Sequence, residues 1–389
     1  MAPTSFSMFC LILTISAFTS IQSASSIASS AACDSTTYPH FCHSSILPRH
    51  GSATIHDYFR FTIAKSLSAA HRLSSFINSH LARAPSLSAP AARALNDCEL
   101  LSDLNIDYLS KVGTALNSSQ TLLDAQVDEF HSLLSAAITN QRTCLDALRE
   151  TPSARRIKRA LSAPLANGAK LYSVGLSLFV RAWTPDKKRH HNIPSEIIRN
   201  GTLVVKMSDR HQRVFETRSG RMVVQDPEGV FINDMVVVSK DGTGNFTTIT
   251  DALGVAPKGK NVNSGYFLIY ITAGVYKEYV KVNKNHMYVM MVGDGINQTI
   301  ITGDHSNSTG WKTFGGATVG VTGRGFVATN ITIRNTAGPI KGQAVALMSN
   351  SDMSAFYGSS FEGYQDTLYK FFNGERIHGD NKSTEMKET

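Results

Sequence analysis

The sequence predicts a two-domain protein, with a helical bundle in its N-terminal half and a domain of stacked β-strands in its C-terminal half. Three observations predict this fold class. The 389 residues are too many for one ordinary domain. Apolar residues recur at helical spacing up to about residue 150, and short β-rich runs replace them after residue 235. A hydrophobic content of 42% also excludes a largely disordered chain.

The chain opens with a short apolar segment, Met8–Phe18, which small residues follow up to Ala32. This order is typical of a secretory signal peptide, and the segment is too short for a membrane anchor. We therefore expect residues 1–24 to be a signal peptide and the protein to be secreted. A buried N-terminal helix is the alternative, because no Lys or Arg precedes the apolar segment.

Cysteine usage indicates an oxidising compartment. Loss of Cys10 with the signal peptide leaves an even number of cysteines, all before residue 150. The four are Cys33, Cys42, Cys98 and Cys144. The first two are close enough to clip the N-terminal extension, and a bridge between the last two would join two helices; buried free thiols are the alternative. Seven glycosylation sequons also favour secretion: Asn117, Asn200, Asn245, Asn297, Asn307, Asn330 and Asn381.

Residues 30–180 are expected to form the bundle. One buried helix face is indicated by Ile63, Leu67, Ala70 and Leu73. We expect breaks between helices at Pro85, Pro90 and the region of Gly113. Short breaks between amphipathic helices predict an up-and-down bundle.

The segment 181–234 is expected to be a basic linker and processing region. Fifteen of the 38 Lys and Arg residues, against four acids, lie between residues 151 and 225. A basic excess confined to one stretch argues against a protein whose whole surface binds nucleic acid. Contact with an acidic polymer and an ordinary solvated linker are the alternatives.

Residues 235–389 are expected to form the β-domain. The predicted strands are Met235–Val238, Phe267–Ile271, Val280–Val282, Met287–Val292, Thr299–Ile301, Phe326–Ile333, Ala344–Met348 and Ala355–Phe361. Most of them are not separated by an amphipathic helix, which disfavours a doubly wound sheet. The two-residue hairpin turns of a sandwich are also scarce, so we favour a parallel β-helix over a β-sandwich.

Residues suited to acyl chemistry cluster late in the chain. Gln343 precedes the pair Gln365-Asp366 by 22 residues, and one β-helix coil takes roughly 20–25 residues, so the three would lie on adjacent coils. Amides can donate to an oxyanion, and a carboxyl group can protonate a departing alcohol. Gln365 and Asp366 can share a site only if the strand ends or bends there. An internal polar ladder between coils is the alternative.

Several segments resemble signature blocks of plant pectin methylesterases: Val237–Asp251, Gly274–Glu278, Phe326–Gly338, Gln343–Leu347 and Tyr364–Tyr369. Upstream segments resemble the invertase and pectin methylesterase inhibitor domain: Cys33–Cys42, Asn96–Leu101 and Thr139–Asp146. The resemblance implies a four-helix inhibitor-like bundle followed by a right-handed parallel β-helix that hydrolyses the methyl esters of galacturonan.

The resemblance also implies roles for single residues. Asp366 would be the general acid and then the base for water, and Gln343 and Gln365 would stabilise the oxyanion. Thr313, together with Gln343, would contact the substrate. The implied partners are methyl-esterified homogalacturonan and an esterase domain, its own or another, bound by the bundle. Neither a metal, an organic cofactor, a nucleic acid nor a membrane is implied.

The resemblance ends before the family's second, nucleophilic aspartate. No Asp-Phe-Ile-Phe-Gly block follows Phe372, and Asp380 lies in a polar stretch that does not match it. We therefore expect an incomplete β-helix, from a truncated or mis-spliced product, with slight esterase activity. Processing is expected at Arg155–Arg159 or within Ser219–Gln225. The rival hypotheses are a secreted inhibitor acting through the bundle on a pectin methylesterase or an invertase, and a non-catalytic pectin-binding solenoid.

Overall fold

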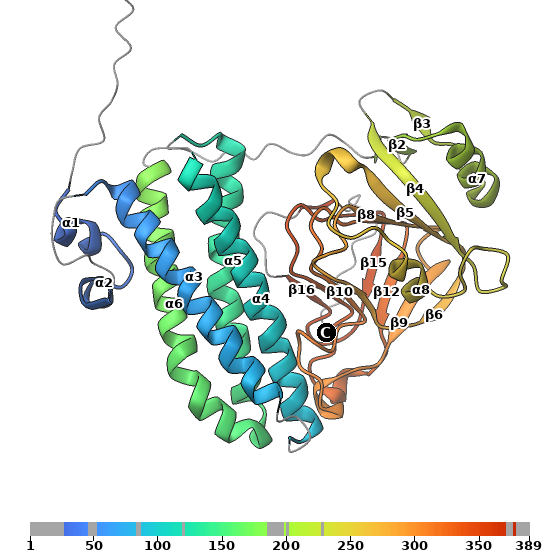
Figure 1. Cartoon of the computed structure of the whole chain (residues 1–389). Coiled ribbons are helices and arrows are strands. Elements are labelled where there is room, and N and C mark those ends of the chain that lie inside the picture. Colours follow the sequence, from blue (N-terminus) through green and yellow to red (C-terminus); the bar gives the residue numbers. More distant parts are fainter. Residues whose placement is uncertain are drawn as a thin grey trace, which may run out of the picture.

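The computed structural model describes residues 27–45, 53–82, 87–118, 121–184, 198–199, 202–226, 229–370 and 376–378. They form a helical bundle that packs beside a domain of short strands (Figure 1). The expected signal peptide and Asp380 lie outside the described residues. Among the helices described, none has the length and the apolar content needed to cross a bilayer.

The bundle consists of two short and four long helices: α1 (Ser29–Asp34), α2 (Pro39–Ser45), α3 (Ile55–Leu81), α4 (Ala89–Ser118), α5 (Asp124–Arg149) and α6 (Arg155–Trp183). Both α4 and α6 pack against α3 and α5, so the predicted four-helix bundle is confirmed. Of the three predicted breaks, Pro85 lies outside the described residues and the other two are misplaced, since the helices are interrupted between α3 and α4 and between α4 and α5. Pro90 lies in the first turn of α4, where its missing N–H has no helical partner to lose. Gly113 lies inside α4, and a Cβ there would already touch Ile63 at 3.4 Å.

Both predicted disulfides are confirmed. Cys33–Cys42 joins α1 to α2, and Cys98–Cys144 joins α4 to α5. The bundle core contains aromatic rings in contact, with the centroids of Phe59 and Phe179 5.4 Å apart and their planes tilted by 50°. Among the long helices, α4 and α5 are therefore joined covalently, and α3 and α6 are held to them by packing.

The strands form three parallel sheets. The first contains β4 (Val230–Val238), β5 (Tyr266–Ile271), β8 (Val289–Gly293), β11 (Val327–Thr329), β14 (Ala355–Tyr357) and β17 (Arg376–His378). The second, which we call the site sheet, contains β7 (Val280–Val282), β10 (Val319–Val321), β13 (Leu347–Ser349) and β16 (Leu368–Lys370). The third contains β6 (Gly274–Lys277), β9 (Thr299–Gly303), β12 (Thr332–Asn335) and β15 (Ser360–Glu362). The chain visits the sheets in turn and each strand pairs in parallel with its counterpart one coil away, which confirms the parallel β-helix.

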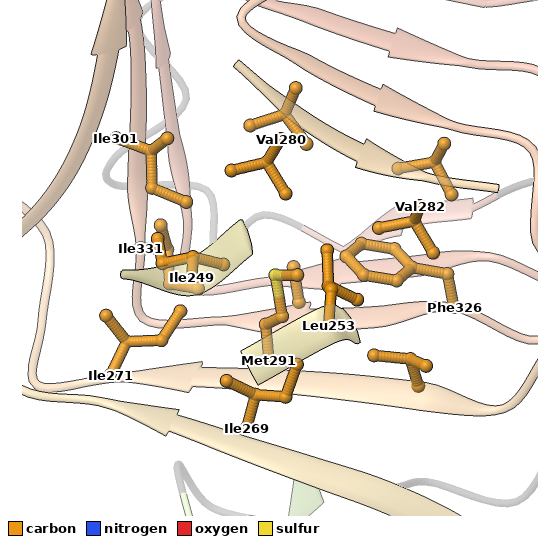
Figure 2. Close-up of a cluster of buried hydrophobic side chains, with 14 of the residues drawn as sticks. Ile249, Leu253, Ile269, Ile271, Val280, Val282, Met291, Ile301, Phe326 and Ile331 are labelled. Atoms are coloured by element: carbon orange, nitrogen blue, oxygen red, sulfur yellow. The ribbon is translucent and has the colours of Figure 1, made fainter. Parts of the chain in front are cut away.

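The interior of the β-helix is filled by apolar side chains, most of them aliphatic, from all three sheets (Figure 2). Ile271 of β5 and Ile301 of β9 lie in this core together with Val280 of β7. The short helix α8 (Ile249–Gly254) packs on the first coil and adds Ile249 to the same cluster. Burial of these alternating residues holds the coils in register.

Two predicted strands are each divided by a corner of the coil. Phe326–Ile333 becomes β11 and β12, because Asn330 between them adopts a left-handed φ of 59°. Ala355–Phe361 becomes β14 and β15, with Gly358 at φ 53°. A residue in this region turns the chain out of one sheet and into the next.

Much of the expected linker is folded. Between residues 198 and 226 lie β1 (Ile198–Arg199), β2 (Thr202–Lys206), α7 (Asp209–Ser219) and β3 (Val224–Gln225). Strand β2 pairs with β4, and Phe215 of α7 packs on Tyr270, with ring centroids 5.3 Å apart. Of the two expected processing sites, Arg155–Arg159 lies at the start of α6 and Ser219–Gln225 covers the connection from α7 to β3.

Candidate functional site

Gln343 and Gln365 lie on adjacent coils at the edge of the site sheet. The backbone N–H of Ala344 donates to the carbonyl oxygen of Gln365 at 3.0 Å. A Cβ at Gly342 would stand 4.0 Å from Oε1 of Gln365. Both glutamine side chains are exposed. Two primary amides are therefore presented to solvent from neighbouring coils.

Asp366 lies at a bend. Its φ of 56° is left-handed, and β16 begins two residues later at Leu368. The chain thus turns at the position where Gln365 and Asp366 would otherwise point to opposite faces. The Asp366 side chain is exposed. The pKa of Tyr369 is raised mainly by burial and, to a smaller extent, by the negative charge of Asp366.

Thr313 lies on the long loop between β9 and β10, half-buried beside Phe314. The same loop contacts Gln343 through Asn307. The Asn307 backbone N–H donates to the Gln343 carbonyl at 2.9 Å, and its Nδ2 donates to Gln343 Oε1 at 3.1 Å. The loop that carries Thr313 is thereby fixed next to one of the two amides.

Asn307 and Lys312 are site residues that sequence reasoning missed. Lys312 Nζ donates to Asn307 Oδ1 at 3.2 Å, which extends the polar chain from Gln343. The only sequence feature that marks Asn307 is its glycosylation sequon, which indicates a modification site and not a role at this site. The hydrogen bond between Asn307 and Gln343 joins two different coils, and no local sequence pattern predicts it.

The bundle covers this loop. Lys312 Nζ also donates to the backbone oxygen of Glu150 at 3.1 Å, and it lies 3.4 Å from the Glu150 carboxylate. Arg93 of α4 donates through Nε and Nη2 to the Gly310 carbonyl at 3.0 and 2.9 Å. Figure 1 shows α4 and α5 beside the strands of the site sheet.

Trp311 is enclosed between a side chain of each domain. The Arg93 guanidinium lies 4.7 Å from the ring centroid of Trp311. On the β-helix side, Trp311 stacks on His305 with centroids 3.8 Å apart, and His305 stacks on Tyr279 at 3.5 Å. Burial lowers the pKa of His305, so the neutral ring is favoured in this stack.

The half-buried carboxyl group of Asp97 lies in the same contact. A Cβ at Gly315 would meet Asp97 Oδ1 at 2.5 Å, so this glycine leaves room for the carboxylate. Burial raises the pKa of Asp97 to about 7, against the opposing effect of nearby Lys281. Burial also lowers the pKa of Lys281 to about 8. Lys281 Nζ donates to the carbonyl of Ala317 at 2.9 Å.

Ion pairs continue the contact along the β-helix. Lys284 lies 2.8 Å from Asp107 of α4, and Arg324 lies 2.7 Å from Glu129 of α5. Arg324 also lies 3.2 Å from Asp352. The bundle thus supplies carboxylates and the β-helix supplies cations at these points. Within the described ranges, no group of three or more His, Cys, Asp or Glu could hold a metal ion.

Comparisons with known proteins match both halves. Residues 28–178 match the family model "Plant invertase/pectin methylesterase inhibitor", and residues 235–378 match the model "Pectinesterase". The chain is 46% identical over 341 residues to the Arabidopsis thaliana protein "Probable pectinesterase/pectinesterase inhibitor 20", and 43% identical over 363 residues to number 41 of the same series. These matches cover 85% and 88% of the chain, but only 60% and 63% of the relatives. The chain therefore spans less than two thirds of their length.

Among solved structures, the chain is similar to "Pectin methylesterase from Carrot". The sequence identity is 46%, and the match covers 34% of this chain and 41% of the carrot protein. The TM-score is 0.33. The assignment of the fold rests on the strand pairing and on the family matches.

Proposed function

We propose that this chain, which belongs to the plant inhibitor family through residues 28–178 and to the pectinesterase family through residues 235–378, is the precursor of a pectin methylesterase. Its substrate is methyl-esterified homogalacturonan, which it hydrolyses to pectate and methanol. The observation that carries this proposal is the presentation of Gln343 and Gln365 on adjacent coils, with Asp366 at the bend beside them.

The proposed chemistry assigns one task to each group. The amides of Gln343 and Gln365 donate to the oxyanion that forms at the ester carbonyl. Asp366 gives a proton to the departing methanol and then accepts one from water. Thr313, together with Gln343, contacts the substrate. The attacking carboxylate of the family is matched by no residue of this sequence. Water would therefore have to attack the ester carbonyl directly, and the proton that it loses restores Asp366. Because this direct attack lacks the family's nucleophile, we propose that the chain releases methanol slowly.

The bundle is proposed to cover the esterase domain of its own chain. The contacts of Arg93 and Glu150 with the loop that carries Thr313 support this proposal. The second candidate is an inhibitor that binds a separate esterase or an invertase. The acidic residues that the bundle presents, Asp107 and Glu129, favour it, because they would fit another basic surface equally well.

Secretion to the cell wall is proposed from the apolar segment Met8–Phe18 and from the two disulfides. We propose that processing occurs near Arg221, which is exposed on the connection between α7 and β3. N-terminal sequencing of the secreted protein tests both steps. Ends near residue 25 and within Ser219–Gln225 are expected, and an end at Met1 alone would contradict them.

Methanol release from methylated pectin tests the catalytic proposal. The full chain is expected to release methanol slowly, and Asp366→Asn is expected to lower the rate by roughly 100-fold or more, because it removes the general acid. Asp209→Asn makes the same chemical change on exposed helix α7 and is expected to leave the rate unchanged.

Equal rates in the Asp366→Asn and Asp209→Asn chains would contradict the assignment of Asp366. Addition of the full chain to a separate pectin methylesterase and to an invertase tests the second candidate. Inhibition of either enzyme, with no methanol release by the chain itself, would favour the inhibitor over the precursor.

A further inference from the structure

Lys312 is held between the two domains. Its side chain is only 11% exposed, although it carries a charge. Its Nζ donates to Asn307 Oδ1, to the Glu150 backbone oxygen and toward the Glu150 carboxylate. Because Asn307 donates to Gln343 Oε1, a single side chain separates this cation from a proposed oxyanion amide. The carboxylate that pairs with Lys312 is that of Glu150, which belongs to the bundle.

The neighbouring residue, Trp311, is covered in a comparable way. One face of its indole ring stacks on His305, which belongs to the β-helix. Arg93, which comes from the bundle, lies over the ring at 4.7 Å and is fixed by two hydrogen bonds to the Gly310 carbonyl. Removal of the bundle would uncover one indole face and one ammonium group on consecutive residues.

We propose that Trp311 and Lys312 form a binding subsite for a uronate unit with a free carboxylate, and that Arg93 and Glu150 occupy this subsite in the full chain. The substrate class rests on the proposed function. An ammonium group in a fixed position binds a carboxylate by a charge-assisted hydrogen bond. An indole face offers a flat apolar surface to a sugar ring and attracts a cation equally well.

The bundle matches both components of such a ligand. The Glu150 carboxylate stands where the uronate carboxylate would bind, and the Arg93 guanidinium stands where the sugar ring would stack. A methyl ester has no negative charge, so Lys312 would distinguish a free uronate from an esterified unit. The ion pairs of Asp107 and Glu129 with β-helix cations show that carboxylates of the bundle meet cations elsewhere on the same contact.

Binding to the full chain tests the proposal. The sequence has two tryptophans, so Trp183→Phe leaves Trp311 as the only indole reporter. In this background, trigalacturonate is titrated while Trp311 emission is followed, and calorimetry measures the same dissociation constant. Glu150→Gln is expected to tighten binding by roughly tenfold, because the competing charge on Lys312 is lost. Asp146→Asn is the matched control, because Asp146 lies on the same helix and pairs with exposed Arg149.

Two further measurements decide the mechanism. The gain from Glu150→Gln is expected to disappear when Lys312→Met is added, and the fully methylated trimer is expected to show no gain. Equal affinities of the Glu150→Gln and Asp146→Asn chains, a gain that survives Lys312→Met, or an equal gain for the methylated trimer would each overturn the proposal. Because the readout is binding, an absence of methanol release leaves this test intact and counts only against the catalytic proposal.

Discussion

At the scale of single residues, Asp97 is a carboxyl group whose surroundings depend on the contact between the domains. It packs against Gly315, with Lys281 and Arg93 as the charges that face it. Burial raises its pKa to about 7, because the loss of water disfavours the ionised form more than the two cations favour it. The proton on Asp97 is therefore linked to the docking of the bundle.

This linkage predicts that docking strengthens as the pH falls from about 7 to about 4. A raised carboxyl pKa contributes stability that is present at low pH and is lost as the pH rises through the docked value. The lowered pKa of Lys281, about 8, adds no pH dependence within this window. Urea unfolding followed by Trp311 emission in the Trp183→Phe chain measures the effect. Asp97 is expected to contribute at most about 1.4 kcal/mol per pH unit to the slope, and Asp97→Asn should remove that contribution. A slope that Asp97→Asn leaves unchanged would contradict this assignment.

At this scale, the sequence alone singled out part of the proposed site. Gln343, Gln365 and Asp366 could be singled out because one coil has a characteristic length, and the left-handed Asp366 meets the condition that the strand bend there. Asn307 and Lys312 could not be singled out. Their contacts depend on the path of the loop between β9 and β10, which joins residues from different coils and different domains.

At the scale of secondary-structure elements, the aliphatic stack inside the β-helix supports the coils. Ile271 of β5 is fully buried within it (Figure 2). Ile271→Ala is expected to lower the free energy of unfolding by roughly 2–5 kcal/mol, because it removes buried methyl groups and leaves a cavity. Urea unfolding of the full chain, followed by circular dichroism, measures this loss.

Val275→Ala on β6 is the control, because the Val275 side chain is 46% exposed. A change of no more than about 0.5 kcal/mol is expected there. Equal decreases in the free energy of unfolding for Ile271→Ala and Val275→Ala would show that the buried side chains inside the β-helix do not determine its stability.

Sequence patterns predicted the elements with uneven success. β5 and β7 were predicted almost to the residue, since apolar runs bounded by turn residues mark them. β11 and β12 were merged into one strand, because Asn330 at their corner interrupts the backbone and not the apolar pattern. Helix α4 was divided at Gly113, where the glycine serves close packing against Ile63 and does not end the helix.

At the scale of the whole molecule, the two domains share one apolar cluster. It combines Leu101 and Cys144 of the bundle with Phe314, Val345 and Met348 of the β-helix. The family resemblance implied that the bundle binds an esterase domain, its own or another. The periodicity did not predict which residues meet, because each domain alone has a complete helical or β-strand pattern. The ion pair between Arg324 and Glu129 lies at the same boundary.

A double-mutant cycle of Arg324→Met and Glu129→Met tests the energy of this boundary. We expect a coupling energy of about 0.5–3 kcal/mol in urea unfolding that decreases as salt is added, because both side chains are partly buried and in direct contact. The Arg149–Asp146 pair inside the bundle is more than half exposed, and we expect a coupling below about 0.5 kcal/mol there. Additive effects of the two Arg324–Glu129 substitutions would contradict the prediction.

The Cys98–Cys144 disulfide has a consequence for how the loop is uncovered. Cys98 follows Arg93 within two helical turns, and Cys144 precedes Glu150 within two turns. The covalent link and the packing of α4 on α5 both restrain the spacing of these helix ends. We therefore expect Arg93 and Glu150 to leave the loop together when the bundle departs.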